Sequence, residues 1–182
     1  MTAIPLRTER LILREFEDGD FAAVHDYARR PDVVRFMPWG PNLEADTRAF
    51  LQRTREARGQ EPRKDYELAV ALAEGGRLIG GAGLHVCREG TGCLGYCYHP
   101  DYWGRGLATE AAGALLRLGF ETLGLHRIFA TCDVENAASV RVMVKNGMRR
   151  EAHFREDARL HGRWRDSYLY AILDREWRKG AG

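Results

Sequence analysis

The sequence predicts an α/β protein in which a mixed sheet carries helices on both faces. Strand-like and helix-like segments alternate in the order β α α β β β α β α β β along 182 residues. In addition, Gly104 and Gly106 stand one residue apart between an apolar strand-like segment and an alanine-rich helical one. A chain of this length can bury a sizeable core, so we expect residues 1–182 to form a single domain.

The first half of the chain has clear breaks between its elements. Residues 10–16 have strand character and end at Asp18-Gly19-Asp20, where an aspartate can cap a helix that Pro31 stops. Segment 36–41 contains two prolines and a glycine, which predicts an aromatic loop that could form a substrate wall. The remaining elements are a helix at about 44–58, strands at 66–72 and 77–86 joined by a Glu74-Gly75-Gly76 turn, and a strand at 93–98.

In the second half, alanines and leucines from Ala108 predict an amphipathic helix that Gly124 closes. A buried strand at 127–132, a turn at 133–136 and a short helix at 137–145 follow, and Asn146-Gly147 stops this helix. Two final strands are expected near 148–155 and 164–173, joined by a polar connection that contains Gly162.

The segment Gly104-Arg105-Gly106 can hold an anion. Glycines tolerate positive φ, so consecutive N–H groups can converge on a phosphate, while the following helix adds unpaired amides and the positive end of its dipole. The same pattern also occurs in ordinary turns. The lysine of a nucleoside triphosphatase loop is absent, and Gly81-Ala82-Gly83 continues into a strand, so nucleotide readings lose their main support. A phosphorylated ligand is the first hypothesis.

The amino-acid composition limits the kinds of molecule that we expect the protein to bind. The net charge of +2 arises from 28 basic and 26 acidic residues without a block of one sign, so we expect no nucleic acid partner. Apolar runs are too short to span a bilayer and no signal-like segment begins the chain, which predicts a cytoplasmic protein without a membrane partner. Cys87, Cys93, Cys97 and Cys132 form no Cys-x-x-Cys pair, so we expect reduced core thiols and no metal site.

Several separated motifs stand in order along the chain: Thr8 to Arg14, Gly95 to Pro100, Tyr102 to Ala111, Asn136 to Ser139, Lys145 to Met148, and Gly162 to Tyr170. Together they resemble the GNAT superfamily of acetyl-CoA-dependent N-acetyltransferases, and within it the RimJ/RimL type that acetylates protein N-termini. The resemblance implies a single-domain GNAT fold, with a mixed, mostly antiparallel sheet of about seven strands and a central splayed parallel pair. It also implies acetyl-CoA as co-substrate.

The family's Q/R-x-x-G-x-G/A loop falls on Trp103 to Ala108, where tryptophan replaces the first Gln or Arg. We expect Trp103 to pack beside the loop while backbone amides bind the pyrophosphate. Arg105 and Lys145 could contact phosphates or be surface charges. The edge near Tyr98 would receive the pantetheine arm, and an N–H near Cys97 or Tyr98 would polarise the acetyl carbonyl. The expected acetyl-CoA contacts are Tyr96, Cys97, Tyr98, His99, Trp103, Gly104, Arg105, Gly106, Leu107, Ala108, Thr109, Asn136, Ser139 and Lys145.

The resemblance further implies direct attack by an amine in a ternary complex. Ser139 would give a proton to the departing thiolate, and Asn136 would hold the splay open by bonding to nearby backbone; alternatively, Asn136 only caps a helix. Five residues are candidates for the general base. Glu156 is our first choice, and the other four are His153, Asp157, His85 and Glu67.

An N-terminal α-amine is the expected acceptor, because its pKa near 7.7–8.0 leaves it partly neutral, whereas a lysine amine near 10.4 needs more help. Trp39, Tyr66 and Phe36 are candidates for the acceptor pocket. The alternatives are a small amine such as an amino acid, polyamine or antibiotic, a non-catalytic acyl-CoA-binding module, and a nucleotide enzyme. A homodimer could form through an edge strand after Trp164.

Overall fold

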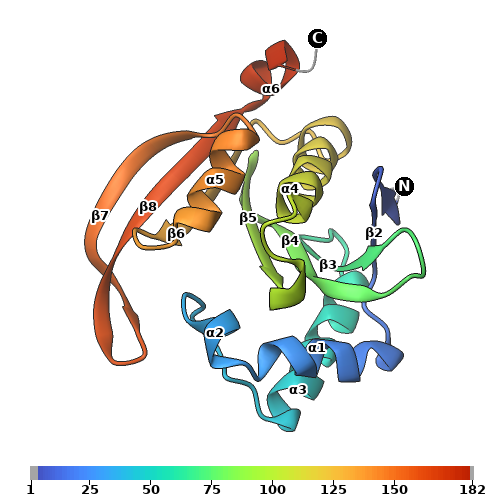
Figure 1. The fold of residues 1–182 in the computed structure, drawn as a ribbon. Helices are drawn as coiled ribbons and strands as arrows, with labels where there is room; N and C mark the ends of the chain where they lie inside the picture. The colour runs from blue at the N-terminus through green and yellow to red at the C-terminus, as the bar shows by residue number, and fades with distance from the viewer. Residues whose placement is uncertain (1–3, 181–182) are drawn as a thin grey trace.

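The computed structural model describes residues 4–180, which form one sheet with helices on both faces (Figure 1). The strands are β1 (Leu6–Arg7), β2 (Leu11–Arg14), β3 (Asp65–Leu72), β4 (Leu78–Arg88), β5 (Thr91–Tyr98), β6 (Arg127–Asp133), β7 (Arg149–Leu160) and β8 (Arg163–Leu173). The α-helices are α1 (Phe21–Ala28), α2 (Pro31–Val34), α3 (Glu44–Arg58), α4 (Leu107–Arg117), α5 (Ala137–Lys145) and α6 (Asp174–Gly180). One π-turn, Leu118–Thr122, extends α4.

The strands lie in the order β1-β2-β3-β4-β5-β6-β8-β7, and within the described residues only the β5–β6 pair is parallel. The expected mixed, mostly antiparallel sheet is therefore confirmed. The strand beyond the expected seven is β1, which has two residues and is too short to show a hydrophobic period.

Two hydrophobic clusters cover the two faces of the sheet. Side chains alternate along β3, so Leu68 and Val70 join the cluster under α4, whereas Ala69 joins the cluster under α1, α2 and α3. On the first face, α4 contributes Leu115 and Leu116, both fully buried. The two faces of the same strands are therefore covered by different helices, α4 on one face and α1, α2 and α3 on the other.

The central parallel strands separate after a short contact. β5 pairs with β6 only from Thr91 to Cys93, opposite Arg127 to Phe129. Beyond Cys93, β5 keeps its antiparallel partner β4 as far as Tyr98 but has no strand on its other side. The segment from Leu94 to Tyr98 is thus an open strand edge inside the sheet.

The last two strands form a long arm that differs from the prediction. β7 runs to Leu160 because the hairpin turn lies at His161 and Gly162, so the expected end near residue 155 is wrong. A register shift occurs between Phe154 and Ala158. β8 lies between β6 and β7, so the strand after Trp164 is not a sheet edge, and the proposed pairing of two copies through it is wrong.

α1 ends at Ala28, before Pro31 as expected, and Pro31 itself stands in the first turn of α2. Local details correct two further expectations. Asp20 stands at the N-cap of α1, but its carboxylate does not cap that helix; it binds the Arg14 guanidinium, 2.7 Å away, and the Glu17 N–H. Cys87 is exposed, so it is not a core thiol. Among residues 4–180, no helix has the length and apolar character needed to cross a membrane.

Candidate active site

The glycine loop before α4 presents free backbone amides. Gly104 and Gly106 have φ angles of 74° and 78°, a conformation that only glycine adopts readily. In the described part of the chain, no N–H from Gly104 to Thr109 donates a hydrogen bond to protein, and the first N–H to do so is that of Glu110, to Gly106 O at 3.1 Å. Six amides therefore remain free at the start of α4, where the helix dipole favours an anion.

The start of the chain fixes this loop. Glu110 accepts hydrogen bonds from Thr8 Oγ1 at 2.6 Å and from Arg10 N at 2.8 Å, and it forms an ion pair with Arg10 Nε at 2.7 Å. Arg10 Nη1 also donates to Arg105 O at 3.0 Å. Burial raises the pKa of Glu110, but these hydrogen bonds outweigh it and lower the pKa overall. Glu110 thus anchors the loop.

Trp103 holds the open edge of β5. Its indole Nε1 donates to Tyr98 O at 2.8 Å, while His99 N donates to Ile79 O of β4 at 2.9 Å. The N–H and C=O of one strand residue point the same way and alternate along the strand, so the Tyr98 N–H points away from β4, toward the open side. The side chain of Trp103 is half exposed and bonded to the strand, which corrects the expected packing role.

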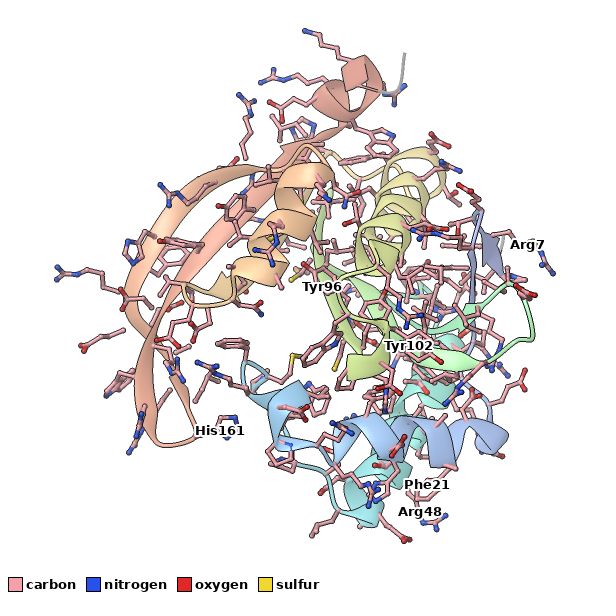
Figure 2. All side chains as sticks on the ribbon, viewed as in Figure 1. Arg7, Phe21, Arg48, Tyr96, Tyr102 and His161 are labelled. Atoms are coloured by element: carbon pink, nitrogen blue, oxygen red, sulfur yellow. The ribbon has the colours of Figure 1, made fainter. Side chains whose placement is uncertain are left out.

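Ser139 and Tyr96 meet across the separated strands. Tyr96 Oη lies 2.7 Å from Ser139 Oγ, and Figure 2 shows Tyr96 on the side of β5 that faces α5. Burial raises the pKa of Tyr96 to about 12, although the bond to Ser139 opposes this rise. Asn136 Oδ1 accepts the backbone N–H of Ser139 at 3.1 Å, so Asn136 caps α5, the second of the two expected roles, and in the described residues its side chain forms no hydrogen bond to β5 or β6.

A cavity of about 670 Å³ opens on the opposite face of the same strands. Its outer wall comes from α1, α3 and the loop 37–42, including Tyr27, Trp39 and Phe50. Its sheet side includes Glu67, His85, Tyr96 and Cys97. The aromatic loop predicted as a substrate wall therefore lines this cavity through Trp39, whereas Phe36 and Tyr66 are not part of its lining.

Two carboxylates flank His85 at the cavity. His85 Nε2 lies 3.2 Å from Glu67 Oε2, and His85 Nδ1 lies 2.9 Å from Asp65 Oδ1. The hydrogen bond to Glu67 is the main cause that raises the pKa of His85 to about 9; burial opposes it and Asp65 adds to it. At neutral pH the group is an imidazolium between two carboxylates, with a net negative charge that favours an incoming ammonium.

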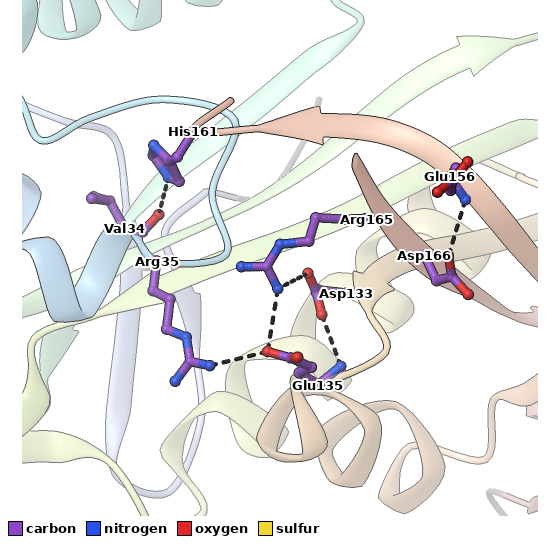
Figure 3. Close-up of polar contacts among 8 residues, drawn as sticks. All are labelled: Val34, Arg35, Asp133, Glu135, Glu156, His161, Arg165 and Asp166. Carbon is purple, nitrogen blue, oxygen red and sulfur yellow. Dashed lines mark hydrogen bonds and ion pairs between the residues drawn. The ribbon is translucent and has the colours of Figure 1, made fainter. Parts of the chain in front are cut away.

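The first choice for the base does not reach the cavity. Glu156 is exposed on the β7 bulge, with φ of 50°, and its N–H donates to Asp166 Oδ1 at 3.0 Å (Figure 3). His153 also binds Asp166, at 2.8 Å, and neither it nor Asp157 lines the cavity. Of the five residues considered, only Glu67 and His85 line the cavity, so the structure does not place Glu156 where a base for an amine in this cavity would stand.

Three other expected contacts lie in different surroundings. His99 points to α1, with Nε2 3.3 Å from Asp26 Oδ2, rather than to the open edge of β5. Arg105 is exposed beside the Tyr102 ring, 5.4 Å from its centroid. Lys145 is exposed at the end of α5, next to Asn146, which donates to Thr109 O at 3.2 Å. Arg105 therefore belongs to the segment with the free amides, whereas Lys145 is connected to this region through its neighbour Asn146.

The remaining expected contacts surround the loop and the edge. Leu107 is buried and fixes the first turn of α4, and Ala108 and Thr109 follow it with free N–H groups. No group of three or more His, Cys, Asp or Glu side chains in residues 4–180 is arranged to hold a metal ion. The site therefore combines an amide nest, an open strand edge, a hydroxyl pair and an acidic cavity.

Comparison with known proteins adds sequence relationships to this geometry. The family described as the acetyltransferase (GNAT) domain matches residues 10–149. The uncharacterised N-acetyltransferase YnaD of Bacillus subtilis is 39% identical over 173 residues, which cover 94% of this chain and 98% of that protein. The ribosomal protein uS5-alanine N-acetyltransferase of Escherichia coli is 26% identical, covering 97% and 94%. The crystal structure of a GNAT acetyltransferase from Bacillus anthracis superposes with a TM-score of 0.84 at 38% identity, covering 93% of this chain and 98% of that one.

Proposed function

The chain belongs to the GNAT family of acetyl-CoA-dependent N-acetyltransferases, and from this premise we propose that it acetylates the N-terminal α-amine of a protein or peptide by direct attack in a ternary complex. An amine acceptor and acetyl-CoA follow from the family itself. The peptide acceptor is supported by the likeness to the uS5-alanine acetyltransferase and by the modest basicity of an α-amine.

One observation carries the proposal. The cavity that contains Glu67 and the free edge of β5 meet at the same three residues, Gly95, Tyr96 and Cys97. An amine in the cavity could thus approach a thioester laid along that edge without moving the strands. Holding two reactants in such a geometry supplies a large part of the rate enhancement in transfer reactions.

The proposed roles follow from the positions of the groups. The free amides of Gly104 to Thr109 suit the diphosphate of CoA, and Trp103 keeps the end of β5 in place through Tyr98 O. The Tyr98 N–H is suited to stabilise the oxyanion that forms on the acetyl carbonyl. Glu67 takes the amine proton, and Ser139 donates to the departing sulfur. His85 fixes the Glu67 carboxylate.

A small-molecule amine is the second candidate acceptor. The cavity volume of about 670 Å³ lies within the range common for small-molecule sites, and its lining combines aromatic and acidic groups. A polyamine or an amino compound could therefore fill it. The third alternative, an acyl-CoA-binding module without catalysis, would use the amides and the strand edge but not Glu67.

A thiol-release assay separates these functions. Purified protein is mixed with acetyl-CoA and a panel of peptides with free N-termini, the same peptides with blocked N-termini, polyamines, amino acids and aminoglycosides. We expect free CoA to rise with unblocked peptides and not with blocked ones. Turnover with small amines alone would move the assignment to the second candidate. Tight binding of acetyl-CoA by calorimetry without turnover on any acceptor would support the module.

A further inference from the structure

Two hydroxyl groups meet where β5 and β6 separate. The pairing of the two strands ends at Cys93 and Phe129, and Tyr96 stands three residues beyond the first of these. From there the Tyr96 side chain reaches the start of α5, with Oη 2.7 Å from Ser139 Oγ and 3.3 Å from Ser139 O. This pair is the side-chain link across the splay, beside the strand edge assigned to the thioester.

We propose that Tyr96 is a positioning residue for the release of CoA: its O–H donates to Ser139 and leaves the Ser139 O–H free to donate to the departing sulfur. The proposal deepens the proposed function and rests on it for the place of the thioester. The direction of donation follows from the two distances, because the phenol has a single hydrogen to donate. Ser139 Oγ lies at 2.7 Å, within the usual O–H···O range, whereas Ser139 O lies at 3.3 Å, beyond it, so we assign this hydrogen to Ser139 Oγ.

The burial of the Tyr96 phenol indicates that this group acts as a hydrogen-bond donor and not as a base. The phenol is largely enclosed, and burial raises the pKa of Tyr96 to about 12, so it keeps its proton at any working pH. A chain of hydrogen bonds polarises each member, and in a poorly hydrated cleft this strengthens the outer O–H of Ser139 as a donor. Tyr96 would therefore act through Ser139, without contacting the sulfur itself.

The transfer step balances without any other reactant. The amine nitrogen bonds to the acetyl carbon, the C–S bond breaks, and its electron pair stays on sulfur. The amine proton goes to the Glu67 carboxylate, which then releases it to solvent water. The thiolate accepts a hydrogen bond from Ser139 and takes up a proton from solvent as CoA leaves, so the proton released and the proton taken up cancel. Tyr96 loses no proton in this scheme.

The first test measures the thiol pKa of CoA bound to the protein, read from the ultraviolet absorbance of the thiolate during a pH titration. A thiol is expected near 8.5 in water, and a hydrogen bond to the anion should lower it by about one unit in the wild type. Ser139→Ala and Tyr96→Phe should each return it toward the value of free CoA, and the double variant should go no further. Tyr168→Phe, on β8, is the matched control and should leave it unchanged.

A thiol pKa that Tyr96→Phe leaves at the wild-type value, or single effects that add in the double variant, would overturn the proposal. The second test follows turnover of acetyl-CoA with a peptide that begins with alanine. Tyr96→Phe should lower kcat about tenfold with little change in the KM for acetyl-CoA, and the loss should shrink when the acetyl group leaves an aromatic thiol, a better leaving group.

An increase in KM with unchanged kcat would mean that Tyr96 only forms part of the wall, which contradicts the proposal. Failure of the wild type to acetylate any acceptor would remove the proposed function, but the thiol titration would still decide the role of Tyr96. Circular dichroism and thermal unfolding of each variant show that the fold is retained.

Discussion

Replacing Glu67 by Gln tests the assignment of the general base. The change keeps the shape of the side chain and removes its negative charge from the cavity, while the free amides of Gly104 to Thr109 lie beyond β5 and are untouched. A positioned general base contributes about 10²–10⁴-fold to a rate, so kcat should fall at least about a hundredfold. The Kd for acetyl-CoA should stay within about twofold, because Glu67 lines only the acceptor cavity.

The same variant changes the titration of His85. The hydrogen bond to Glu67 is the largest cause that raises the pKa of His85 to about 9, so the pKa in Glu67→Gln should fall toward 6.5. A histidine with a raised pKa stabilises the folded state fully below its unfolded pKa, near 6.5, and loses this contribution as the pH rises through about 9. Chemical unfolding of the wild type should show this loss between those pH values, reduced by solvent because the side chain is 38% exposed. The variant should show less of it.

The assay is acetyl-CoA thiol release against pH, together with an NMR titration of the His85 ring. Glu156→Gln is the matched control, because it makes the same chemical change on the exposed β7 bulge. We expect its kcat to equal that of the wild type. If Glu156→Gln lost activity while Glu67→Gln kept it, the reasoning from the cavity to the base would be refuted.

Three further substitutions test the proposed acetyl-CoA site and the contacts that hold it in place. Gly106→Ala forces an alanine into φ of 78°, at about 1–2 kcal/mol, and should weaken acetyl-CoA binding about tenfold by calorimetry; an unchanged Kd would count against the amide nest, and Gly19→Ala, in open space, is the control. Trp103→Phe removes the donor to Tyr98 O and should raise the KM for acetyl-CoA several-fold, whereas an unaltered KM would mean that this bond does not hold the edge. Glu110→Gln should lower the free energy of unfolding in urea by about 1–3 kcal/mol at pH 7. Since the pKa of Glu110 is lowered, this difference should be fully present above the unfolded pKa of about 4.3 and vanish as the pH falls through the lower folded pKa, and a difference that stayed unchanged after protonation of Glu110 would contradict the anchoring role.

Most of the fold could be predicted from the sequence, because its local signals are strong. The bounds predicted for the helices at 44–58 and 137–145 are those of α3 and α5. For α5 the reason is visible: Asn136 caps its start, and Gly147 follows it with φ of 76°. The glycine loop was equally readable, since Gly104 and Gly106 both take the positive φ that the pattern requires.

The base could not be assigned from the chain alone. Local sequence does not say which face of a strand turns to a cavity, and Glu156 belongs to a bulge that no short pattern announces. The pairing of β3 and β4 sets Asp65 opposite His85, and Glu67 follows on the same face of β3. Counting outward from the turn at residues 74–76 could have placed these three side chains together, although the register shift near Val70 disturbs such a count.

Contacts between distant segments were also out of reach. Tyr96 and Ser139 are 43 residues apart, and only the separation of β5 from β6 brings their hydroxyls together. Likewise, the bonds from Thr8 and Arg10 to Glu110 link the first motif of the chain to the glycine loop across about a hundred residues. These contacts depend on tertiary packing and have no local signature.

We propose that the free amides of residues 104–109 hold the diphosphate of acetyl-CoA and so direct its thioester along β5. Amide hydrogen exchange tests it most directly, measured with acetyl-CoA and with S-acetylpantetheine, which lacks the diphosphate. We predict that acetyl-CoA slows exchange at Gly104 to Thr109 and at Tyr98, and that S-acetylpantetheine at saturation slows exchange only at Tyr98. Equal protection of the loop by both compounds, or no protection by acetyl-CoA, would contradict the account.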